Sequence, residues 1–123
     1  MALVDLMVEH GGLITAADLA GYTPEWTEPI STTYRGHWRV STLTCPSPNY
    51  GVQLLQSLNM LEHFPLAEYG HNTERGLHTI CEVLKRASAD RVTWRNSGKA
   101  EELLLDKGYA ASRAAEIGDE ATP

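Results

Sequence analysis

The loop that runs from Cys45 to Gly51, Cys-Pro-Ser-Pro-Asn-Tyr-Gly, holds the side chains best suited to chemistry. It places a thiol, a hydroxyl and a phenol close together. Cysteine catalysis needs a thiolate on an accessible, electropositive loop with an imidazole in reach. The sequence has five histidines, but no catalytic-cysteine signature surrounds Cys45. A Cys45-dependent enzyme is therefore one hypothesis, set against a partly buried loop cysteine.

The histidines show no metal-binding pattern. They are His10, His37, His63, His71 and His78. None forms HxH, HxxxH or HExxH, the spacings that place two imidazoles on one face. We expect surface or capping roles for them, no metal and no cofactor. Gly11-Gly12 lacks the strand and the further glycine of a phosphate-binding loop, and it indicates the end of a helix.

Charged residues on one predicted helix could suggest a polar site. They are Glu82, Asp90 and Arg91. Charges in the middle of a helix more often lie on a solvated face or form ion pairs, and we expect that here. Arg91, near the helix end, can reach the last carbonyls or dock on a neighbouring element. No nucleophile, base and oxyanion donor come together, so residue types alone do not describe a self-sufficient enzyme.

Length, composition and charge limit the class of protein. A chain of 123 residues is one domain at most, and its apolar share of 42% favours an ordered globular protein over a disordered one. A net charge of −6 without any basic block disfavours nucleic acid and anionic membranes as partners. No apolar run approaches the roughly 18 residues of a membrane span. Cys45 and Cys81 form neither a CxxC pair nor a disulfide framework.

The first half of the chain predicts two short helices and a β-hairpin. Apolar spacing predicts a helix over residues 2–9. Thr15-Ala-Ala-Asp18 is a capping box that opens a very short helix ending at Gly21. Residues 30–43 predict a hairpin, because β-branched and aromatic residues flank the turn Arg35-Gly36-His37.

Three helices are expected in the second half, so the fold class is α+β, mostly α. The first follows Asn49, a good N-cap, and ends near Phe64-Pro65. The second runs from about Thr73 to Trp94. The third spans roughly residues 101–117 with an interruption expected at Gly108, and the polar tail is expected to be frayed.

The second of these helices has a predicted inner and outer face. The polar side carries Glu82, Lys85 and Arg86, which form i+3 and i+4 pairs. We expect the apolar stripe, which includes Cys81, to pack in the core. The stripe consists of Leu77, Ile80, Cys81, Leu84 and Ser88.

An ordered set of short motifs spans roughly residues 5–92. These are Gly11 to Ala20 (GGLITAADLA), Tyr22, Pro29-Ile30, Tyr34-Arg-Gly36, Pro46 to Gly51, Leu54 to Glu62 (LLQSLNMLE), Tyr69-Gly70, His78, Glu82, Lys85 and Ala89-Asp-Arg91. No single motif is specific, but their order and spacing resemble the γ-glutamyltransferase (γ-glutamyltranspeptidase) family of N-terminal-nucleophile hydrolases. The resemblance implies part of an αββα fold.

The resemblance also implies what this chain lacks. Family members are made as one precursor that cleaves itself just before a threonine. That threonine begins the small subunit, and its hydroxyl attacks the γ-glutamyl amide while its own amine serves as base. This chain is similar to the C-terminal part of the large subunit, and none of its residues matches a catalytic position. No metal or organic cofactor is implied.

Two departures from the family pattern stand out. The family's proline-rich loop commonly ends in a glycine pair, whereas here Tyr50 precedes Gly51. After Asp90-Arg91 the usual Gly-Asp-Pro turn is replaced by Trp94-Arg-Asn-Ser-Gly98. These departures could mark a divergent subfamily that acts on another γ-glutamyl or acyl-amide substrate.

The leading hypothesis is a single partial domain, residues 1–123, that acts as a scaffold segment of such an enzyme and is inactive alone. The whole enzyme would transfer or hydrolyse γ-glutamyl groups of glutathione-like amides. Expected partners are the remainder of the large subunit and the small catalytic subunit, or a second copy. Asn49, Tyr50 and Gly51 are candidate substrate-binding residues in a cleft completed by another chain. The alternative is a free-standing helical protein-interaction module.

Overall fold

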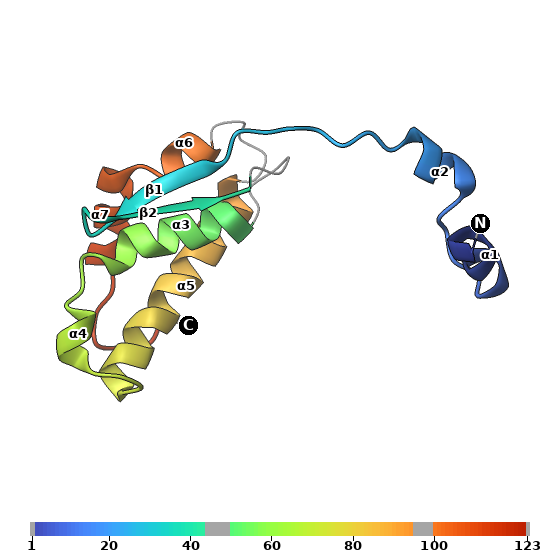
Figure 1. The fold of residues 1–123 in the computed structure, drawn as a ribbon. Helices are drawn as coiled ribbons and strands as arrows, with labels where there is room; N and C mark the ends of the chain where they lie inside the picture. Colours follow the sequence, from blue (N-terminus) through green and yellow to red (C-terminus); the bar gives the residue numbers. More distant parts are fainter. Residues whose placement is uncertain (1, 44–49, 95–99, 123) are drawn as a thin grey trace.

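A helical body with one β-hairpin carries an N-terminal arm that stands away from it (Figure 1). The structure is a computed structural model, and it describes residues 2–43, 50–94 and 100–122. The predictions that concern Cys45, Ser47 and Asn49 lie outside the described residues.

The arm consists of the two helices expected from the sequence and an extended segment. These are α1 (Ala2–Glu9) and α2 (Ala16–Gly21). The capping box is confirmed, because the Asp18 amide donates to Thr15 Oγ1 at 3.2 Å and the Thr15 amide donates to Asp18 Oδ2 at 2.8 Å. Neither helix buries a residue. Residues 22–29 then lead to the body without helix or strand.

The hairpin forms where the sequence predicts it. Strands β1 (Ile30–Tyr34) and β2 (Trp38–Thr42) are antiparallel, with Ile30 opposite Thr42 and Tyr34 opposite Trp38. The turn places Arg35 at φ +50° and Gly36 at φ +70°. Glycine adopts the left-handed region at little cost, so Gly36 suits this tight connection.

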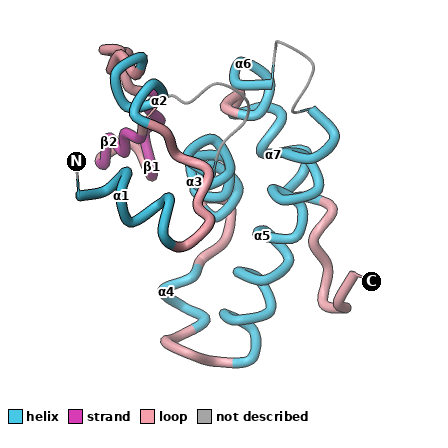
Figure 2. The backbone as a smooth tube through the Cα atoms, turned by 90° about the vertical axis from the view of Figure 1, so that its right-hand side faces the viewer, coloured by secondary structure: helices cyan, strands magenta, loops and turns pink. Residues whose placement is uncertain are grey.

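Helix α3 (Tyr50–Leu61) is the centre of the body, with the hairpin on one side and α5 and α7 on the other (Figure 2). The remaining helices are α4 (Leu66–Tyr69), α5 (Glu74–Trp94), α6 (Ala100–Leu104) and α7 (Lys107–Ala115). One apolar cluster joins the hairpin to α3 and α6, and consists of Ile30, Val52, Leu55 and Leu104. A second joins α3 to α5 and α7, and consists of Met60, Val83, Ala87, Ala110 and Ala114.

The last predicted helix is broken at a different residue from the one expected. The break falls at Leu105-Asp106, between α6 and α7, and Gly108 lies inside the first turn of α7. Asp106 determines the break, because its Oδ1 accepts from the Tyr109 amide at 2.7 Å and caps the new helix. The short helix α4 was not predicted.

The predicted apolar stripe of α5 does not face the core. Leu77 is 47% exposed, Ile80 37% and Leu84 46%, and Cys81 is exposed as well, so the assignment of Cys81 to the core is wrong. The buried side of α5 carries smaller or polar residues instead. They are Gly76, Thr79, Glu82, Val83, Ala87 and Asp90. Small side chains let α3 approach α5 closely, which large ones would prevent.

Candidate functional site

The described part of the predicted substrate loop lies at the start of α3. Tyr50 is 75% exposed, and its ring packs on the guanidinium of Arg91, with Cζ 4.6 Å from the ring centroid. Arg91 therefore docks on a neighbouring helix, one of the two roles expected for it. Gly51 is half-buried in the first turn of α3. The assignment of Asn49, Tyr50 and Gly51 to substrate binding stays a prediction.

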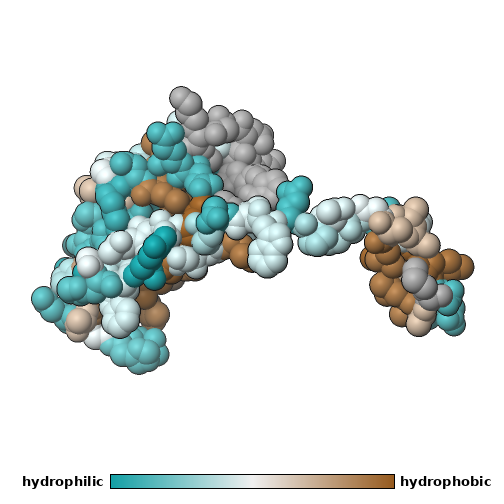
Figure 3. Space-filling model, turned by 45° about the horizontal axis from the view of Figure 1, so that its top comes forward, coloured by the Kyte–Doolittle hydropathy of each residue, from teal (hydrophilic) through white to brown (hydrophobic). Residues whose placement is uncertain are grey.

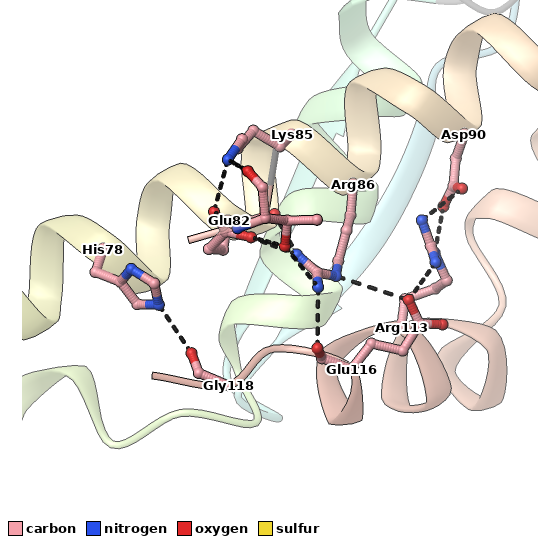
Figure 4. Close-up of polar contacts among 9 residues, drawn as sticks. His78, Glu82, Lys85, Arg86, Asp90, Arg113, Glu116 and Gly118 are labelled. Carbon is pink, nitrogen blue, oxygen red and sulfur yellow. Dashed lines mark hydrogen bonds and ion pairs between the residues drawn. The ribbon is translucent and has the colours of Figure 1, made fainter. Parts of the chain in front are cut away.

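The motif residues of α5 converge on a buried carboxylate (Figure 4). Glu82 is 2% exposed and accepts hydrogen bonds from Lys85 Nζ at 2.8 Å, Arg86 Nη1 at 2.7 Å and Thr122 Oγ1 at 2.5 Å. The Thr122 amide donates a further bond at 3.1 Å. These bonds, led by those from Lys85, Thr122 and Arg86, hold the pKa of Glu82 far below its usual range. The predicted i+3 and i+4 pairs are confirmed, but Glu82 does not lie on a solvated face.

Residues 116–122, here called the C-terminal strap, are tied along α5 (Figure 4). His78 Nε2 lies 2.8 Å from the Gly118 carbonyl oxygen, and Arg86 Nη2 donates to the Glu116 carbonyl at 2.9 Å. Lys85 Nζ also donates to the Thr122 carbonyl. The expectation of a frayed tail is therefore wrong for residues 118–122, because side chains of α5 bond to Gly118 and Thr122.

A second buried carboxylate joins three helices. Asp90 of α5 is 6% exposed, and it accepts from Gln56 Nε2 of α3 at 2.7 Å. Arg113 of α7 donates to it through Nε at 3.1 Å and lies 3.0 Å away through Nη2. Burial lowers the pKa of Arg113, but hydrogen bonds to Glu116 and Asp90 more than offset this and raise it. Asp90 thus fixes how α3, α5 and α7 sit against one another.

Two residues of the α3 motif fasten the hairpin. Asn59 is fully buried, accepts from Thr32 Oγ1 of β1 at 2.6 Å and donates through Nδ2 to the Leu105 carbonyl at 3.1 Å. Glu62 accepts from Lys107 Nζ at 2.7 Å and from the amide that follows β1 at 3.0 Å. Burial raises the pKa of Glu62, but the hydrogen bonds from Lys107 and that amide outweigh burial and hold the pKa below its usual value. The LLQSLNMLE motif therefore serves packing between elements.

No reaction centre assembles among the residues that the structure describes. Their His, Cys, Asp and Glu side chains form no group of three that could hold a metal ion. An open cleft of about 370 Å³ is lined by residues of α5, α6 and the turn after it, none of which belongs to a motif. They are Trp94, Glu102, Leu103 and Asp106. Within the described ranges, every helix is too short or too polar to cross a membrane.

Sequence reasoning missed the long-range partners of the motif residues. Thr122, Arg113 and Gln56 each bind a carboxylate of α5 from another element. Gln56 was visible as a position of the LLQSLNMLE motif, but Thr122 and Arg113 had no assigned role in the sequence. The carboxylates themselves were visible as motif positions, but not as buried ones.

Comparisons with known proteins agree over the whole chain. The family model for gamma-glutamyltranspeptidase matches residues 1–123. The acylase ACY 1 proenzyme of Pseudomonas sp. (strain SE83) is 38% identical over 120 residues, which is 94% of this chain and 21% of that protein. The glutathione hydrolase proenzyme of Escherichia coli (strain K12) is 36% identical over 115 residues, which is 90% of this chain and 20% of that protein.

Two solved structures share the fold. The gamma-glutamyltranspeptidase of Helicobacter pylori aligns with a TM-score of 0.81 at 30% identity, covering 99% of this chain and 36% of that one. A cephalosporin acylase from Bacillus halodurans aligns with a TM-score of 0.69 at 34% identity, covering 94% and 22%. This chain spans about a fifth of the length of the curated relatives it matches. A match over every residue assigns the family, and the chain belongs to the gamma-glutamyltranspeptidase family.

Proposed function

We propose that this chain is a scaffold segment of an enzyme that transfers or hydrolyses γ-glutamyl groups of glutathione-like amides. It corresponds to the C-terminal part of the large subunit, as a single partial domain over residues 1–123. The observation that carries this proposal is that the motif residues bond one element of the fold to another. Glu82, Asp90, Asn59 and Glu62 are engaged in ties between elements, and none of them faces an open reaction centre.

The hairpin fits a part of a larger sheet. A two-stranded sheet is marginal alone, and the outer edges of a sheet are where further strands pair. In the αββα arrangement, β1 and β2 would be two strands of one layer, and α3 and α5 would belong to the helical layer beside it. The remainder of the large subunit and the small subunit would complete both layers.

The chemistry would come from the small subunit. Its N-terminal threonine would attack the γ-glutamyl carbonyl through its hydroxyl, with its own amine as the base, and the amine of the substrate would leave. Water or an acceptor amine would then release the γ-glutamyl group. This chain would supply the support for that site, and Asn49, Tyr50 and Gly51 would approach its rim. The chain alone is therefore expected to be inactive.

The first experiment assays the purified 123-residue chain for hydrolysis of a γ-glutamyl anilide. We expect no release of the aniline, and turnover that survives repurification and follows the chain through a second column would overturn the proposal. The second experiment reads the coding sequence beyond Pro123. A Thr-Thr or Thr-Ser junction followed by small-subunit-like sequence is expected, and its absence would leave the catalytic threonine without a source.

The substrate of the whole enzyme has a second candidate. The acylase ACY 1 proenzyme is 38% identical to this chain, and the Bacillus halodurans structure is a cephalosporin acylase. An acyl-amide substrate uses the same threonine chemistry on a different acyl group. The mature enzyme, assayed with a γ-glutamyl anilide and with a cephalosporin amide, distinguishes the two by the ratio of kcat/KM values.

A free-standing interaction module is the alternative from another class. A module should be a soluble monomer with a cooperative melt, because it would have no missing partner. A scaffold segment leaves apolar helix faces uncovered, as α5 does with Leu77, Ile80 and Leu84. Light scattering of the chain at several concentrations separates these outcomes.

A further inference from the structure

The two ends of the chain are held in opposite ways. Neither helix of the N-terminal arm buries a residue, and the arm stands apart from the body as the brown cluster in Figure 3. The C-terminal strap, residues 116–122, is bonded to α5 at both of its ends and in between. Its residues 118–122 add no side chain to either apolar cluster, so polar bonds hold this part of the described chain.

One arginine of α5 closes the strap into a loop. Arg86 Nη2 donates to the Glu116 carbonyl at 2.9 Å and to Thr122 Oγ1 at 3.3 Å, so the first and last residues of the strap meet at one nitrogen. Between them, the Gly118 carbonyl reaches His78, which lies about 12 Å before Arg86 along the axis of α5. The strap therefore runs out along α5 and returns to the residue from which it started.

Glu82 is the acceptor on which this loop closes. The Thr122 amide donates to its Oε1 at 3.1 Å, and the Thr122 hydroxyl donates to its Oε2 at 2.5 Å. Two charge-assisted bonds to one residue fix the orientation of that residue as well as its position. Thr122 itself is exposed, so these bonds, together with the one from Lys85 to its carbonyl, hold it in place of burial.

The side of α5 that meets the strap is a single polar stripe. His78, Glu82 and Lys85 stand at positions i, i+4 and i+7, which lie on one side of a helix, and all three bond to the strap. Asp90 bonds to α3 and α7 instead. The stripe adds no apolar contact to the core, and its effect is to fix the path of the chain that follows α7.

We propose that Glu82 and Arg86 are positioning residues for the self-cleavage of the parent precursor, a role that rests on the proposed function, in which the chain continues beyond Pro123 to the cleavage threonine. With the strap closed, the continuing chain leaves the body at Thr122. With the strap open, the last residue that packs on the body is Ile117. The free segment before the threonine is then longer, and each doubling of a free segment makes the meeting of its ends about threefold rarer.

The cleavage hydrolyses one peptide bond. Water supplies the hydroxyl group of the new carboxyl terminus and one proton of the new amine, and no other reactant is needed. Glu82 and Arg86 take no part in this exchange of atoms. Their loss should therefore slow the conversion of precursor into subunits, and should leave the turnover of enzyme that has already matured unchanged.

The test follows the whole precursor, made by cell-free translation with a short pulse of label, as it converts into two bands on denaturing gels. Glu82→Gln should slow the conversion about threefold or more. Thr122→Val removes the hydroxyl bonds at an exposed site and should slow it as well. Thr122→Ser keeps both the amide and the hydroxyl, and should convert at the wild-type rate. Once matured, each variant should show wild-type kcat and KM on a γ-glutamyl anilide.

Asn59→Ala separates positioning from a general loss of stability. Asn59 bonds to β1 and to the Leu105 carbonyl rather than to the strap, so this variant should be destabilised and yet convert at the wild-type rate while folded. Equal slowing by Asn59→Ala, or wild-type conversion of Glu82→Gln and Thr122→Val, would overturn the positioning role alone. A wild-type precursor that never converts would overturn the proposed function and this role with it. If Glu82→Gln does not fold, Thr122→Val decides.

Discussion

The bond network of Asn59 gives the sharpest stability prediction. This fully buried amide connects β1 to the turn between α6 and α7, because it accepts from Thr32 Oγ1 at 2.6 Å and donates to the Leu105 carbonyl at 3.1 Å. Asn59→Ala removes both bonds at once. It also leaves the Thr32 hydroxyl and the Leu105 carbonyl without these partners inside the body.

The size of the effect follows from these two bonds. A neutral hydrogen bond contributes about 0.5–1.5 kcal/mol net, and a buried group left without a partner costs about 1–3 kcal/mol. Asn59→Ala should therefore lower the free energy of unfolding by about 2–4 kcal/mol. That is a large share of the roughly 5–15 kcal/mol that stabilises a typical domain. Thr32→Val, which removes one bond, should cost about 1 kcal/mol.

Urea unfolding followed by circular dichroism at one fixed protein concentration measures these values. Ser57→Ala is the matched control, because Ser57 is also buried on the same helix but its hydroxyl donates to the Gln53 carbonyl of that helix and not to another element among the described residues. We expect it to cost less than about 1 kcal/mol. The reasoning fails if Asn59→Ala costs no more than Ser57→Ala. It also fails if Thr32→Val still costs its full amount in the Asn59→Ala background, since that bond would already be gone.

Three further perturbations test other ties. Glu82→Gln removes a carboxyl whose pKa lies far below its usual 4.5. The wild-type advantage should be full above pH 4.5 and should shrink as acid titrates the folded carboxyl, in acid unfolding curves. Lys107→Met frees Glu62 and the Thr33 carbonyl, but Lys107 is 44% exposed, so urea unfolding should show a loss below about 1 kcal/mol. Gly76→Val places a side chain 3.2 Å from the Gly70 carbonyl, and should lower Tm by several degrees.

The same Glu82→Gln variant should also release the C-terminal strap. Hydrogen exchange of the Thr122 amide reports this directly, because that amide donates to Glu82 in the folded chain. Exchange should become faster in Glu82→Gln and stay unchanged in Ser41→Glu, which lies on β2. An equally protected Thr122 amide in both variants would show that the other bonds hold the strap by themselves.

Local rules predicted the elements that depend on neighbours in sequence. The capping box needs only Thr15 and Asp18, and the hairpin turn needs only Arg35 and Gly36, so both were recognised and both are confirmed. The strap is different. Its partner Glu82 lies forty residues from Thr122, and no pattern within a helix or a tail connects them. The break before α7 was misplaced for a related reason, since a glycine inside a helix was weighed above the capping carboxylate of Asp106.

The two sides of α5 explain why its apolar stripe was wrongly predicted to pack in the core. Helical periodicity identifies the side with the largest apolar residues, here Leu77, Ile80 and Leu84, and assigns it to the core. That inference holds when the largest apolar residues of a helix lie on its buried side. On α5 the small residues face inward: Ala87 packs in the cluster with Met60 of α3, Gly76 lies close to the Gly70 carbonyl, and the large residues remain exposed. The wrong prediction of the core therefore identifies an exposed apolar surface on α5.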